Sequence, residues 1–535
     1  MDNKEIFLQM NNASFRYPSG EYLFENIKTS VKQGDKIALV GANGTGKSTL
    51  LRILTGGIQL EEGALICNKA TYYLKQIDIT LQQKNFKLYE YVTTLYENWW
   101  EVLDRAQKLF GTEYEPDLNV SSLSGGELMK LNLAAAAVHN PDILLMDEPT
   151  NHLDIQSVQT LISYLGTQKA AYIIVSHDTF FLDQVVNEIW ELENKKITVY
   201  GGNYTFYKEQ KALHLKGIQK RVSIAHDKLE RANDLAQKEE EKRARKANSA
   251  KMAFIKGSMD KDRYQVGKNA ASAGMSNKKI ILDTLKETAE QELEELETEK
   301  RKLAFINMKN TSNNAGKTLV NVEHANLFVG NTELISDISI QLLYSDRIVF
   351  CGNNGSGKTT LIKGLLKTDP KIKLEGEVVI NPSIVYVYVD QSYSIIKPDL
   401  NLLQNIMEFD KTVPEWKAKE QLGKFQFKSE MEMNKKGKDL SGGEMARLMM
   451  AMVTSYPIDL LVLDEPTNNL DVETIEVLEK ALNSFVGTLI VVSHNMEFLN
   501  KINIKKGYIV KNKSLKLMMN NPSNRDAFYQ ELVAK

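Results

Sequence analysis

The sequence predicts a protein of the α/β class in which two copies of one domain flank a long helical segment. Four motifs occur twice, in the same order, along the 535 residues. In each copy a short β-type run leads into a glycine-rich loop and a helical pattern follows, which is a strand–loop–helix arrangement. Between the copies the apolar residues change to a heptad spacing, which is typical of long packed helices.

Composition and charge fit several globular domains and argue against other classes. A chain of 535 residues allows three or four domain-sized units. The formal net charge is −2, so any preference for nucleic acid must come from a local patch. Cys67 and Cys351 provide neither a disulfide framework nor a metal cluster, which suits a reducing cytosol. The first ten residues lack a secretory pattern, and no run approaches the ~18 apolar residues of a membrane span. We therefore expect a cytoplasmic protein without a membrane part.

The duplication is visible in four paired segments. The offset between the copies is 311 residues for the first pair and 317 for the other three, a drift too small for coincidental loops. The pairs are GANGTGKST (41–49) with GNNGSGKTT (352–360), LSGGE (123–127 and 440–444), ILLMDEPTNHLD (143–154) with LLVLDEPTNNLD (460–471), and IIVSHD (173–178) with IVVSHN (490–495). We predict domains at residues 1–204 and 316–535, with the interval 205–315 between them.

The glycine-rich loops match GxxxxGK[ST] and follow strand-like runs at Lys36–Val40 and Arg347–Phe350. Such a loop lets backbone N–H groups converge on phosphates at a helix N-terminus. We expect Lys47 and Lys358 to meet the β- and γ-phosphates, and Ser48 and Thr359 to bind Mg²⁺. The nucleotide-binding candidates in the loops are Gly41, Asn43, Gly44, Gly46, Lys47, Ser48 and Thr49, and Gly352, Asn354, Gly355, Gly357, Lys358, Thr359 and Thr360.

Two carboxylates end a buried strand in each copy, and a histidine follows another strand. Asp147 and Asp464 are placed to hold Mg²⁺, and Glu148 and Glu465 to polarise an attacking water as general bases. An isolated Asp-Glu pair is more often a solvated turn, and a lone histidine is more often structural. The glycine loop upstream favours the functional interpretation, in which the histidines contact the γ-phosphate. The catalytic candidates are Glu148, Glu465, His177 and His494.

The order of P-loop, LSGGE, DEPTN and Ser-His resembles that of the ATP-binding-cassette ATPases. The resemblance implies two cassettes, each with a helical signature subdomain, that pair head to tail and enclose ATP with Mg²⁺. In such a sandwich the signature of one cassette caps the P-loop of the other. Ser124, Gly125 and Gly126 would then cover the second site, and Ser441, Gly442 and Gly443 the first. Both copies retain every motif, so we expect ATP hydrolysis at both sites.

The same resemblance implies further contacts with the nucleotide. Gln76 and Gln391 correspond to the Q-loop beside the metal ion, and Asp154 and Asp471 to the D-loop. The aromatic residue that stacks on adenine would be Tyr17 in the first copy and Phe328 in the second.

The interval between the copies predicts two long antiparallel helices joined by a loop. The first seam comprises Ile218, Val222, Ala225, Leu229, Ala232 and Ala236, and the second Leu282, Leu285, Ala289, Leu293, Leu296 and Leu303. The period is lost at the tip, around residues 250–277, where three glycines occur. A first helix of about 40 residues would reach roughly 60 Å, more than a plain connection needs.

Positive charge is concentrated near this tip. Residues 236–280 contain twelve Lys or Arg against five Asp or Glu, a local net charge of +7. A charge run is usually a solvated helix face, but this one also carries Met and aromatic residues that could stack on RNA bases. The RNA-contact candidates are Lys242, Arg243, Arg245, Lys246, Lys251, Phe254, Lys256, Met259, Arg263, Tyr264 and Lys268.

Two kinds of family member carry two cassettes in a chain without membrane helices: fused importer ATPases and the ribosome-binding ABC-F proteins. The chain resembles ABC-F proteins in the Glu of LSGGE, in EPTN-[HN]-LD in both halves and in the long helical linker. A nucleic-acid repair ATPase is a third possibility.

Within ABC-F, the chain resembles the antibiotic-resistance members. Only 48 residues separate Gln76 from Ser124, and 50 separate Gln391 from Ser441, so neither cassette has room for the arm of the housekeeping members. No long coiled coil follows the second cassette. The resemblance implies a monomer with paired cassettes that binds the ribosome at the tRNA exit site and projects its linker toward P-site tRNA and the peptidyl-transferase centre. ATP hydrolysis would release it. A housekeeping translation factor remains the alternative, and Trp99 and Trp100 are interpreted as core residues rather than partner contacts.

Overall fold

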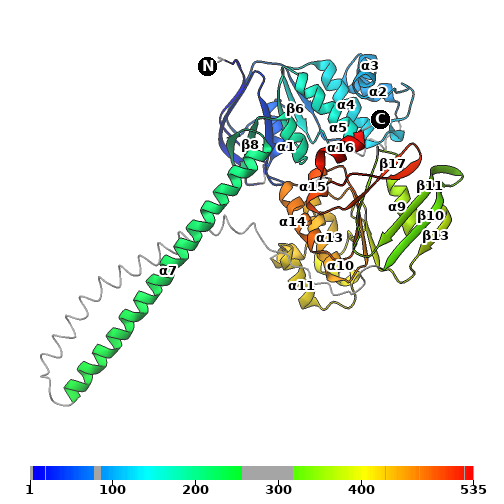
Figure 1. The fold of residues 1–535 in the computed structure, drawn as a ribbon. Coiled ribbons are helices and arrows are strands. Elements are labelled where there is room, and N and C mark those ends of the chain that lie inside the picture. The colour runs from blue at the N-terminus through cyan, green and yellow to red at the C-terminus, as the bar shows by residue number, and fades with distance from the viewer. Residues whose placement is uncertain are drawn as a thin grey trace. The chain divides into compact units, whose positions relative to one another are not determined.

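A computed structural model describes residues 4–18, 20–77, 86–255, 317–427, 429–468, 470–522 and 524–533 (Figure 1). The chain divides into two compact units. One combines Met1–Tyr207 with Phe305–Lys535 and so holds both cassettes, and the other is Lys208–Ala304.

The first cassette has a three-stranded antiparallel sheet and a six-stranded sheet that is parallel except at its last strand. The small sheet has the order β2-β1-β4, with β1 (Ile6–Arg16), β2 (Tyr22–Lys32) and β4 (Glu62–Cys67). The large sheet has the order β5-β6-β7-β3-β8-β9, with β3 (Lys36–Val40), β5 (Thr71–Leu74), β6 (Ile143–Asp147), β7 (Ala171–Val175), β8 (Glu188–Glu193) and β9 (Lys196–Gly201). The helices are α1 (Lys47–Leu54), α2 (Leu88–Leu95), α3 (Trp99–Phe110), the 3-10 turn η2 (Val120–Ser122), α4 (Gly125–His139), α5 (Ile155–Thr167) and α6 (Thr179–Val185).

The second cassette repeats this plan, with its strands joined in the order β13-β10-β11-β18-β17-β12-β16-β15-β14. The strands are β10 (Thr318–Val329), β11 (Thr332–Leu343), β12 (Arg347–Cys351), β13 (Ile372–Ile380), β14 (Tyr386–Val389), β15 (Leu460–Asp464), β16 (Thr488–Val492), β17 (Lys506–Lys511) and β18 (Ser514–Leu517). The helices are α9 (Lys358–Leu366), α10 (Leu402–Phe409), α11 (Glu415–Lys424), α12 (Glu430–Met433), η3 (Gly437–Asp439), α13 (Gly442–Ser455), α14 (Val472–Ser484), α15 (Met496–Lys501) and α16 (Arg525–Val533). The prediction of two cassettes of the α/β class is confirmed.

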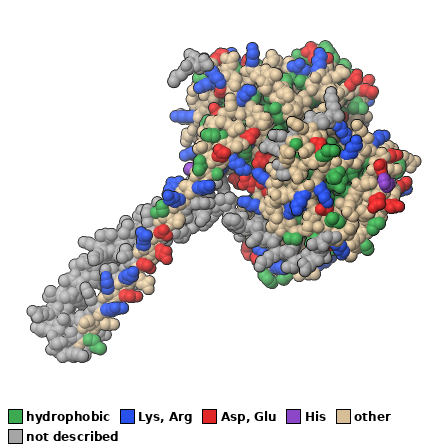
Figure 2. All heavy atoms as spheres, viewed as in Figure 1, with side chains coloured by type: hydrophobic (Ala, Val, Ile, Leu, Met, Phe, Trp, Pro, Cys, Tyr) green, Lys and Arg blue, Asp and Glu red, His purple; other side chains and the backbone are tan. Residues whose placement is uncertain are grey.

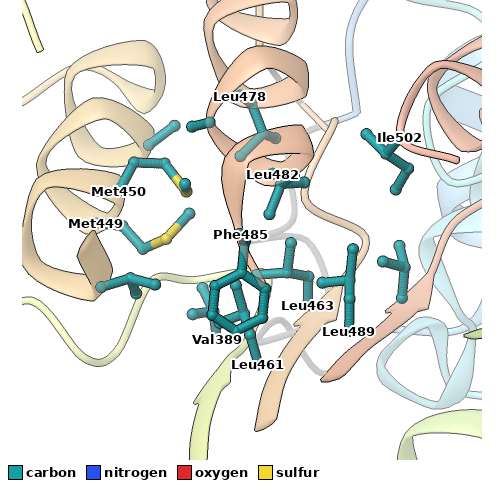
Figure 3. Close-up of a cluster of buried hydrophobic side chains, with 14 of the residues drawn as sticks. Val389, Met449, Met450, Leu461, Leu463, Leu478, Leu482, Phe485, Leu489 and Ile502 are labelled. Carbon is teal, nitrogen blue, oxygen red and sulfur yellow. The ribbon is translucent and has the colours of Figure 1, made fainter. Parts of the chain in front are cut away.

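The parallel strands are short and apolar because helices cover both faces of such a sheet. All five residues of β6 are buried, as are all five of β15, and both strands end in an aspartate. Figure 3 shows how this core is filled in the second cassette: Met449 and Met450 of α13 and Leu482 of α14 lie over the side chains of Leu461 and Leu463 from β15. This packing fixes the strand end at which Asp464 and Glu465 emerge.

The two tryptophans in the helical subdomain of the first cassette differ in burial. Trp99 is half-buried, packs against the subdomain core and contacts the ring of Tyr89. Trp100 keeps 55% of its surface exposed and meets Trp99 edge to face. The expectation of a core residue therefore fits Trp99 and not Trp100.

The chain leaves the first cassette through α7 (Tyr204–Ile255), a single helix of 52 residues. At 1.5 Å per residue this helix is roughly 78 Å long, longer than the sequence predicted. Both basic and acidic side chains occur along its visible face (Figure 2). The predicted second helix and the tip beyond residue 255 lie outside the described residues. Within the described ranges, no helix is both long and apolar enough to cross a membrane.

Packing of the buried core in the second cassette should dominate the stability of that cassette. Leu482 is fully buried, so Leu482→Ala removes packed methyl groups and leaves a cavity, which costs about 2–5 kcal/mol. We expect a clearly lower thermal unfolding midpoint by circular dichroism. Leu517→Ala, at a position with 61% exposure, is the matched control and should leave the midpoint nearly unchanged. Equal effects of the two changes would contradict this description of the core.

Candidate functional site

Each P-loop follows one strand of its sheet and packs against the neighbouring strand. The loop follows β3 in the first cassette and β12 in the second, and α1 and α9 begin at its lysine. A Cβ on Gly41 would lie 2.5 Å from the carbonyl oxygen of Leu192, and one on Gly352 equally close to that of Val510. Only glycine fits such an approach. The loops therefore present backbone N–H groups at a helix N-terminus, where phosphate binds well.

The P-loop lysines are buried and fold back onto their own loops. The Nζ atom of Lys47 donates to the carbonyls of Gly41 and Ala42 at 2.7 and 2.9 Å. Lys358 donates to the carbonyls of Gly352 and Asn353 at 2.7 and 3.0 Å. Burial lowers the pKa of both ammonium groups, while the charges of Glu148 and Glu465 oppose that shift. Phosphate oxygens would offer each cation a stronger acceptor than a neutral carbonyl.

A hydroxyl and a carboxylate meet at the end of β15. The carboxylate oxygen Oδ2 of Asp464 accepts hydrogen bonds from the hydroxyl groups of Thr359 at 2.7 Å and Tyr388 at 3.1 Å. The other oxygen, Oδ1, is buried without a hydrogen-bond partner. In the first cassette, Tyr73 donates to Asp147 at 2.9 Å, and Ser48 holds the place of Thr359 at the start of α1. An unpartnered carboxylate oxygen beside a hydroxyl suits a hard divalent cation, so these residues fit Mg²⁺.

The two glutamates that follow these aspartates are held in an unusual backbone conformation. Glu148 and Glu465 have φ angles of 52° and 49°, in the left-handed region that non-glycine residues seldom adopt. The N–H of Glu148 donates to the carbonyl of Val175 at 2.8 Å, and that of Glu465 donates to Val492 at the same distance. These bonds tie each glutamate to the strand that precedes the predicted histidine. Such conformations cluster at functional sites.

Each glutamate lies against its histidine, and both groups are buried. The Nε2 atom of His177 is 3.1 Å from Oε1 of Glu148, and that of His494 is 3.3 Å from Oε1 of Glu465. Burial raises the pKa of Glu148 and of Glu465 to about 8, with further contributions from Asp147 and Asp464. Burial also lowers the pKa of His177 to about 4 and that of His494 to about 3. Both imidazoles are therefore neutral at pH 7, and these contacts are not ion pairs.

The second P-loop and the first signature line one cavity of about 410 Å³. The side-chain amide of Asn354 donates to the carbonyl of His152 at 2.5 Å, which joins the second P-loop to the first cassette. A Cβ on Gly126 would lie 2.5 Å from that carbonyl and 2.9 Å from the amide nitrogen. The predicted residues that line the cavity are Ser124, Gly125, Gly126, His177, Asn354, Gly355, Gly357, Lys358, Thr359, Thr360, Gln391, Asp464, Glu465 and His494. The structure thus brings these residues together head to tail.

At the first P-loop, Asp471 of the second cassette forms a hydrogen bond with the loop. Its Oδ2 atom accepts the N–H of Asn43 at 2.9 Å, and its Oδ1 atom caps α14 through the N–H of Thr474 at 2.8 Å. Burial favours the neutral acid, but the bonds from Thr474 and Asn43 outweigh it and lower the pKa of Asp471. Ser441 caps α13 in the way Ser124 caps α4. A Cβ on Gly443 would meet Thr474 of its own cassette at 3.0 Å.

The glutamate of LSGGE has a local role that the sequence analysis did not identify. The carboxylate of Glu127 accepts the N–H and the hydroxyl of Ser124, both at 2.7 Å, while its own N–H donates to the Ser124 hydroxyl oxygen. Glu444 and Ser441 repeat this reciprocal capping box. The sequence S-x-x-E immediately before an apolar run was the signal that could have revealed it.

The two residues expected to stack on adenine occupy different structural positions. Tyr17 follows the end of β1, whereas Phe328 lies within β10. Tyr17 is 46% exposed, and its hydroxyl lies 3.1 Å from that of Thr49 in the P-loop. The paired bulges of β1 and β10 align Ala13 with Ala325, so Val329 is the counterpart of Tyr17 and Phe328 that of Arg16. Phe328 is half-buried in β10, and Leu334 is the residue from this region that lines the cavity. An extra loop between β1 and β2 hides this offset in the sequence.

The remaining candidates are described only in part. Gln76 is exposed and follows β5, near the end of the strand beside β6. Among the RNA-contact candidates, Lys242 and Arg245 are exposed on α7. The helix also contains Arg243, Lys246, Lys251 and Phe254, whose side chains are outside the description, and Lys256, Met259, Arg263, Tyr264 and Lys268 lie beyond the described residues.

Known proteins resemble the chain over nearly its whole length. The family model described as ABC transporter matches residues 24–151 and 335–468, once in each half. The ATP-binding protein Uup of Buchnera aphidicola subsp. Schizaphis graminum is 30% identical over 521 residues, 94% of this chain and 81% of the relative. The ABC transporter F family member 5 of Arabidopsis thaliana is 29% identical over 539 residues, 90% of this chain and 72% of the relative.

Two further likenesses concern proteins named for the ribosome. The ribosome protection protein VmlR of Bacillus subtilis (strain 168) is 29% identical over 531 residues, 98% of this chain and 90% of the relative. A chain in the crystal structure of the complex of archaeal ribosomal stalk protein aP1 and archaeal ribosome recycling factor aABCE1 aligns with a TM-score of 0.60. The alignment covers 96% of this chain and 92% of the other at 17% identity, which concerns the fold alone.

The close approach at Gly126 should make this position intolerant of a side chain. Gly126→Ala would press on a backbone carbonyl of the first cassette and on Asn354 of the second, and such overpacking costs about 1–3 kcal/mol. In steady-state ATPase assays we expect a roughly 5- to 150-fold loss of kcat/KM. Gly166→Ala, where a Cβ meets nothing within 4 Å, is the control, and Gly443→Ala should be milder because its Cβ meets a side chain. Full activity of Gly126→Ala would disprove this packing.

Proposed function

The chain belongs to the ABC-F family of tandem ATP-binding-cassette ATPases, and we propose that ATP-driven pairing of its cassettes lets it bind the ribosome. The observation that carries this proposal is α7, a 52-residue helix that leaves the first cassette on the way to the second. A connection between two domains needs no such length, whereas a helix that reaches into a partner does. The name and the nearly full-length similarity of the ribosome protection protein from Bacillus subtilis support the same conclusion.

The proposed chemistry at the second site uses residues that already lie together. Lys358 exchanges the carbonyls of Gly352 and Asn353 for phosphate oxygens. The neutral imidazole of His494 donates a hydrogen bond to the γ-phosphate. Glu465, whose pKa burial raises to about 8, takes the proton of the attacking water, because a base whose pKa lies near the working pH is efficient. Lys47, His177 and Glu148 have the same roles at the first site.

Mg²⁺ completes the proposed sites. Asp464 and Thr359 would hold the ion at the second site, with Gln391 beside them, and Asp147, Ser48 and Gln76 at the first. Bound there, the ion neutralises phosphate charge. The signature residues of the opposite cassette, Ser124 to Gly126 for the second site and Ser441 to Gly443 for the first, donate hydrogen bonds to the enclosed nucleotide. Tyr17 provides a stacking surface for adenine at the first site, whereas Phe328, which aligns with Arg16, is not its structural counterpart in the second cassette.

The finer proposal is protection of the ribosome from antibiotics. Between β5 and the signature, the described residues of the first cassette form only α2, α3 and a 3-10 turn, which leaves no long arm in that part. We propose a cytoplasmic monomer that enters the tRNA exit site and directs its linker, through Lys242, Arg245 and the residues beyond, toward P-site tRNA and the peptidyl-transferase centre. A housekeeping translation factor would bind the same ribosomes without relieving drug inhibition.

Blocking hydrolysis should trap the protein on ribosomes. In the double variant Glu148→Gln/Glu465→Gln, loss of the general base should lower ATP turnover by roughly 10²- to 10⁴-fold and leave ATP binding intact. Sedimentation with purified ribosomes and ATP should then recover more of the variant than of the unmodified protein. The control is Glu420→Gln on the exposed face of α11. If the double variant hydrolyses no ATP yet fails to sediment with ribosomes, the proposed partner is wrong.

The charge on α7 should contribute to ribosome binding and to drug relief. Lys242 and Arg245 are exposed, so Lys242→Glu/Arg245→Glu should lower affinity for ribosomes and flatten its salt dependence by about one unit of slope per lost phosphate contact. Cell-free translation inhibited by drugs of the peptidyl-transferase centre should recover with the unmodified protein and less with this variant. Lys220→Glu, exposed nearer the first cassette, is the control. Recovery with none of the drugs would favour the housekeeping role.

A further inference from the structure

The first turn of α7 lies in a cluster of polar residues that the proposed chemistry does not use. We call this cluster the linker junction: Thr179, Asp183 and Glu191 of the first cassette, Tyr204, Thr205 and Tyr207 of α7, and Glu479, Glu497 and Lys501 of the second cassette. All of these residues belong to described elements.

Two carboxylates of the first cassette anchor α7. Asp183 of α6 accepts the N–H of Thr205 at 2.7 Å and also the Thr205 hydroxyl. Glu191 of β8 accepts the hydroxyl of Tyr207 at 2.6 Å. Glu191, Tyr204 and Tyr207 are each at most 6% exposed. A helix N-terminus has unpaired N–H groups and a positive dipole end, so carboxylates at this place stabilise the start of α7.

The cassette fold itself does not require a carboxylate at position 191. Gly41 packs on the carbonyl of Leu192 in β8, and Gly352 packs in the same way on that of Val510 in β17. The residue before Leu192 is Glu191, whereas the residue before Val510 is Ile509, an apolar side chain that packs on the second cassette's core. Burying a carboxylate is costly without strong hydrogen bonds. Glu191 therefore serves α7, which only the first cassette carries into the linker.

The helix that anchors α7 also carries a contact between the cassettes. The hydroxyl of Thr179, at the first position of α6, donates to Glu497 of α15. Glu497 in turn pairs with Lys501 at 2.7 Å, and Lys501 pairs with the buried Glu479 at 3.3 Å. Thr179 and Asp183 are four residues apart, so they lie on one face of α6. One short helix therefore touches both the second cassette and the linker.

The same helix follows directly from the nucleotide site. His177 lies against Glu148, and Asp178 caps α6 by accepting the N–H of Phe181 at 3.0 Å. The second cassette also acts on α7 through its charges. Burial first, and then the negative charges of Glu497 and Glu476, raise the pKa of Tyr204. The field of the second cassette therefore extends to the first residue of the linker helix.

We propose that the linker junction transmits cassette pairing to the linker. When the second cassette closes, Glu497 engages Thr179 and fixes α6, and Asp183 and Glu191 then hold the first turn of α7 in one orientation. When the cassettes separate, α6 loses this restraint and α7 is free to turn at its root. Tyr207 and Thr179 are positioning residues in this scheme. The inference rests on the ATP-driven pairing proposed above and does not depend on which partner the linker reaches.

Distances between spin labels can report the pairing of the cassettes and the response of α7 separately. The parent is the full-length Glu148→Gln/Glu465→Gln protein with Cys67→Ala, in which the fully buried Cys351 remains. One label pair, Gln107→Cys with Lys417→Cys, reports cassette pairing, and the other, Gln107→Cys with Asp227→Cys, reports α7. All three positions are exposed on helices. ATP should shift both distance distributions in the parent.

Tyr207→Phe keeps the buried ring and removes the hydrogen bond to Glu191. We expect it to keep the ATP-induced shift of the cassette pair and to lose at least half of the shift of the α7 pair. Thr179→Val should raise severalfold the ATP concentration that half-saturates both shifts. In proteins that retain Glu148 and Glu465, Tyr207→Phe should change ATP turnover by less than about twofold. The controls are Tyr386→Phe and Thr160→Val, which each remove a hydroxyl that bonds a carbonyl within its own cassette.

The possible outcomes are distinct. An α7 shift of full size in both Tyr207→Phe and Thr179→Val would overturn the inference. So would a parent in which ATP moves the cassette pair and leaves the α7 pair unchanged. If ATP moves neither pair in the parent, the pairing proposed above is itself wrong.

Discussion

The contact of each P-loop with the opposite cassette is the constraint on which the remaining structure depends. Asn354 of the second loop donates to the carbonyl of His152, and Asn43 of the first loop donates to Asp471. Each loop is therefore hydrogen-bonded to the opposite cassette. In the proposed mechanism the loops bind phosphate through backbone N–H groups, so small changes in the distance between the cassettes would alter the hydrogen-bond donors around the nucleotide. Under this proposal nucleotide binding and pairing of the cassettes are thermodynamically linked, and the long helix that leaves the first cassette would respond to both.

The duplicated motifs sit in surroundings that have diverged. The two glutamates share the same left-handed backbone, the same bond to a neighbouring strand and the same contact with a neutral histidine. Around them each P-loop is contacted from the opposite cassette, the second by His152 and the first by Asp471. The strand beside the P-loop carries Glu191 in one cassette and Ile509 in the other. The same geometry around the two glutamates is thus combined with a different residue beside each P-loop, and the carboxylate occurs in the cassette that carries the linker helix.

Local sequence patterns predicted the parts of this protein that depend on neighbouring residues. The strands before the P-loops, the lysines at the helix starts and the Asp-Glu pairs at strand ends all follow from short-range rules, and the structure places them at the expected edges. The position of Phe328 did not follow, because the shift between β1 and β10 arises from bulges and from a loop of unequal length. Thr179 with Glu497, and Asn354 with His152, join residues hundreds of positions apart, so no periodicity could predict them. The capping role of Glu127 is a local feature that the pattern S-x-x-E before an apolar run predicts.

The reciprocal capping of the signature serines has a consequence for how tightly the cassettes close. The hydroxyl of Ser124 donates a hydrogen bond to the carboxylate of Glu127 at 2.7 Å, and that of Ser441 donates to Glu444 at 2.9 Å. A phosphate that recruits either hydroxyl must draw the proton away from a carboxylate, which is itself a strong acceptor. In the proposed mechanism the glutamate of LSGGE would therefore compete with the nucleotide for the serine hydroxyl. That competition would weaken the closed state and favour reopening of the cassettes after each turnover.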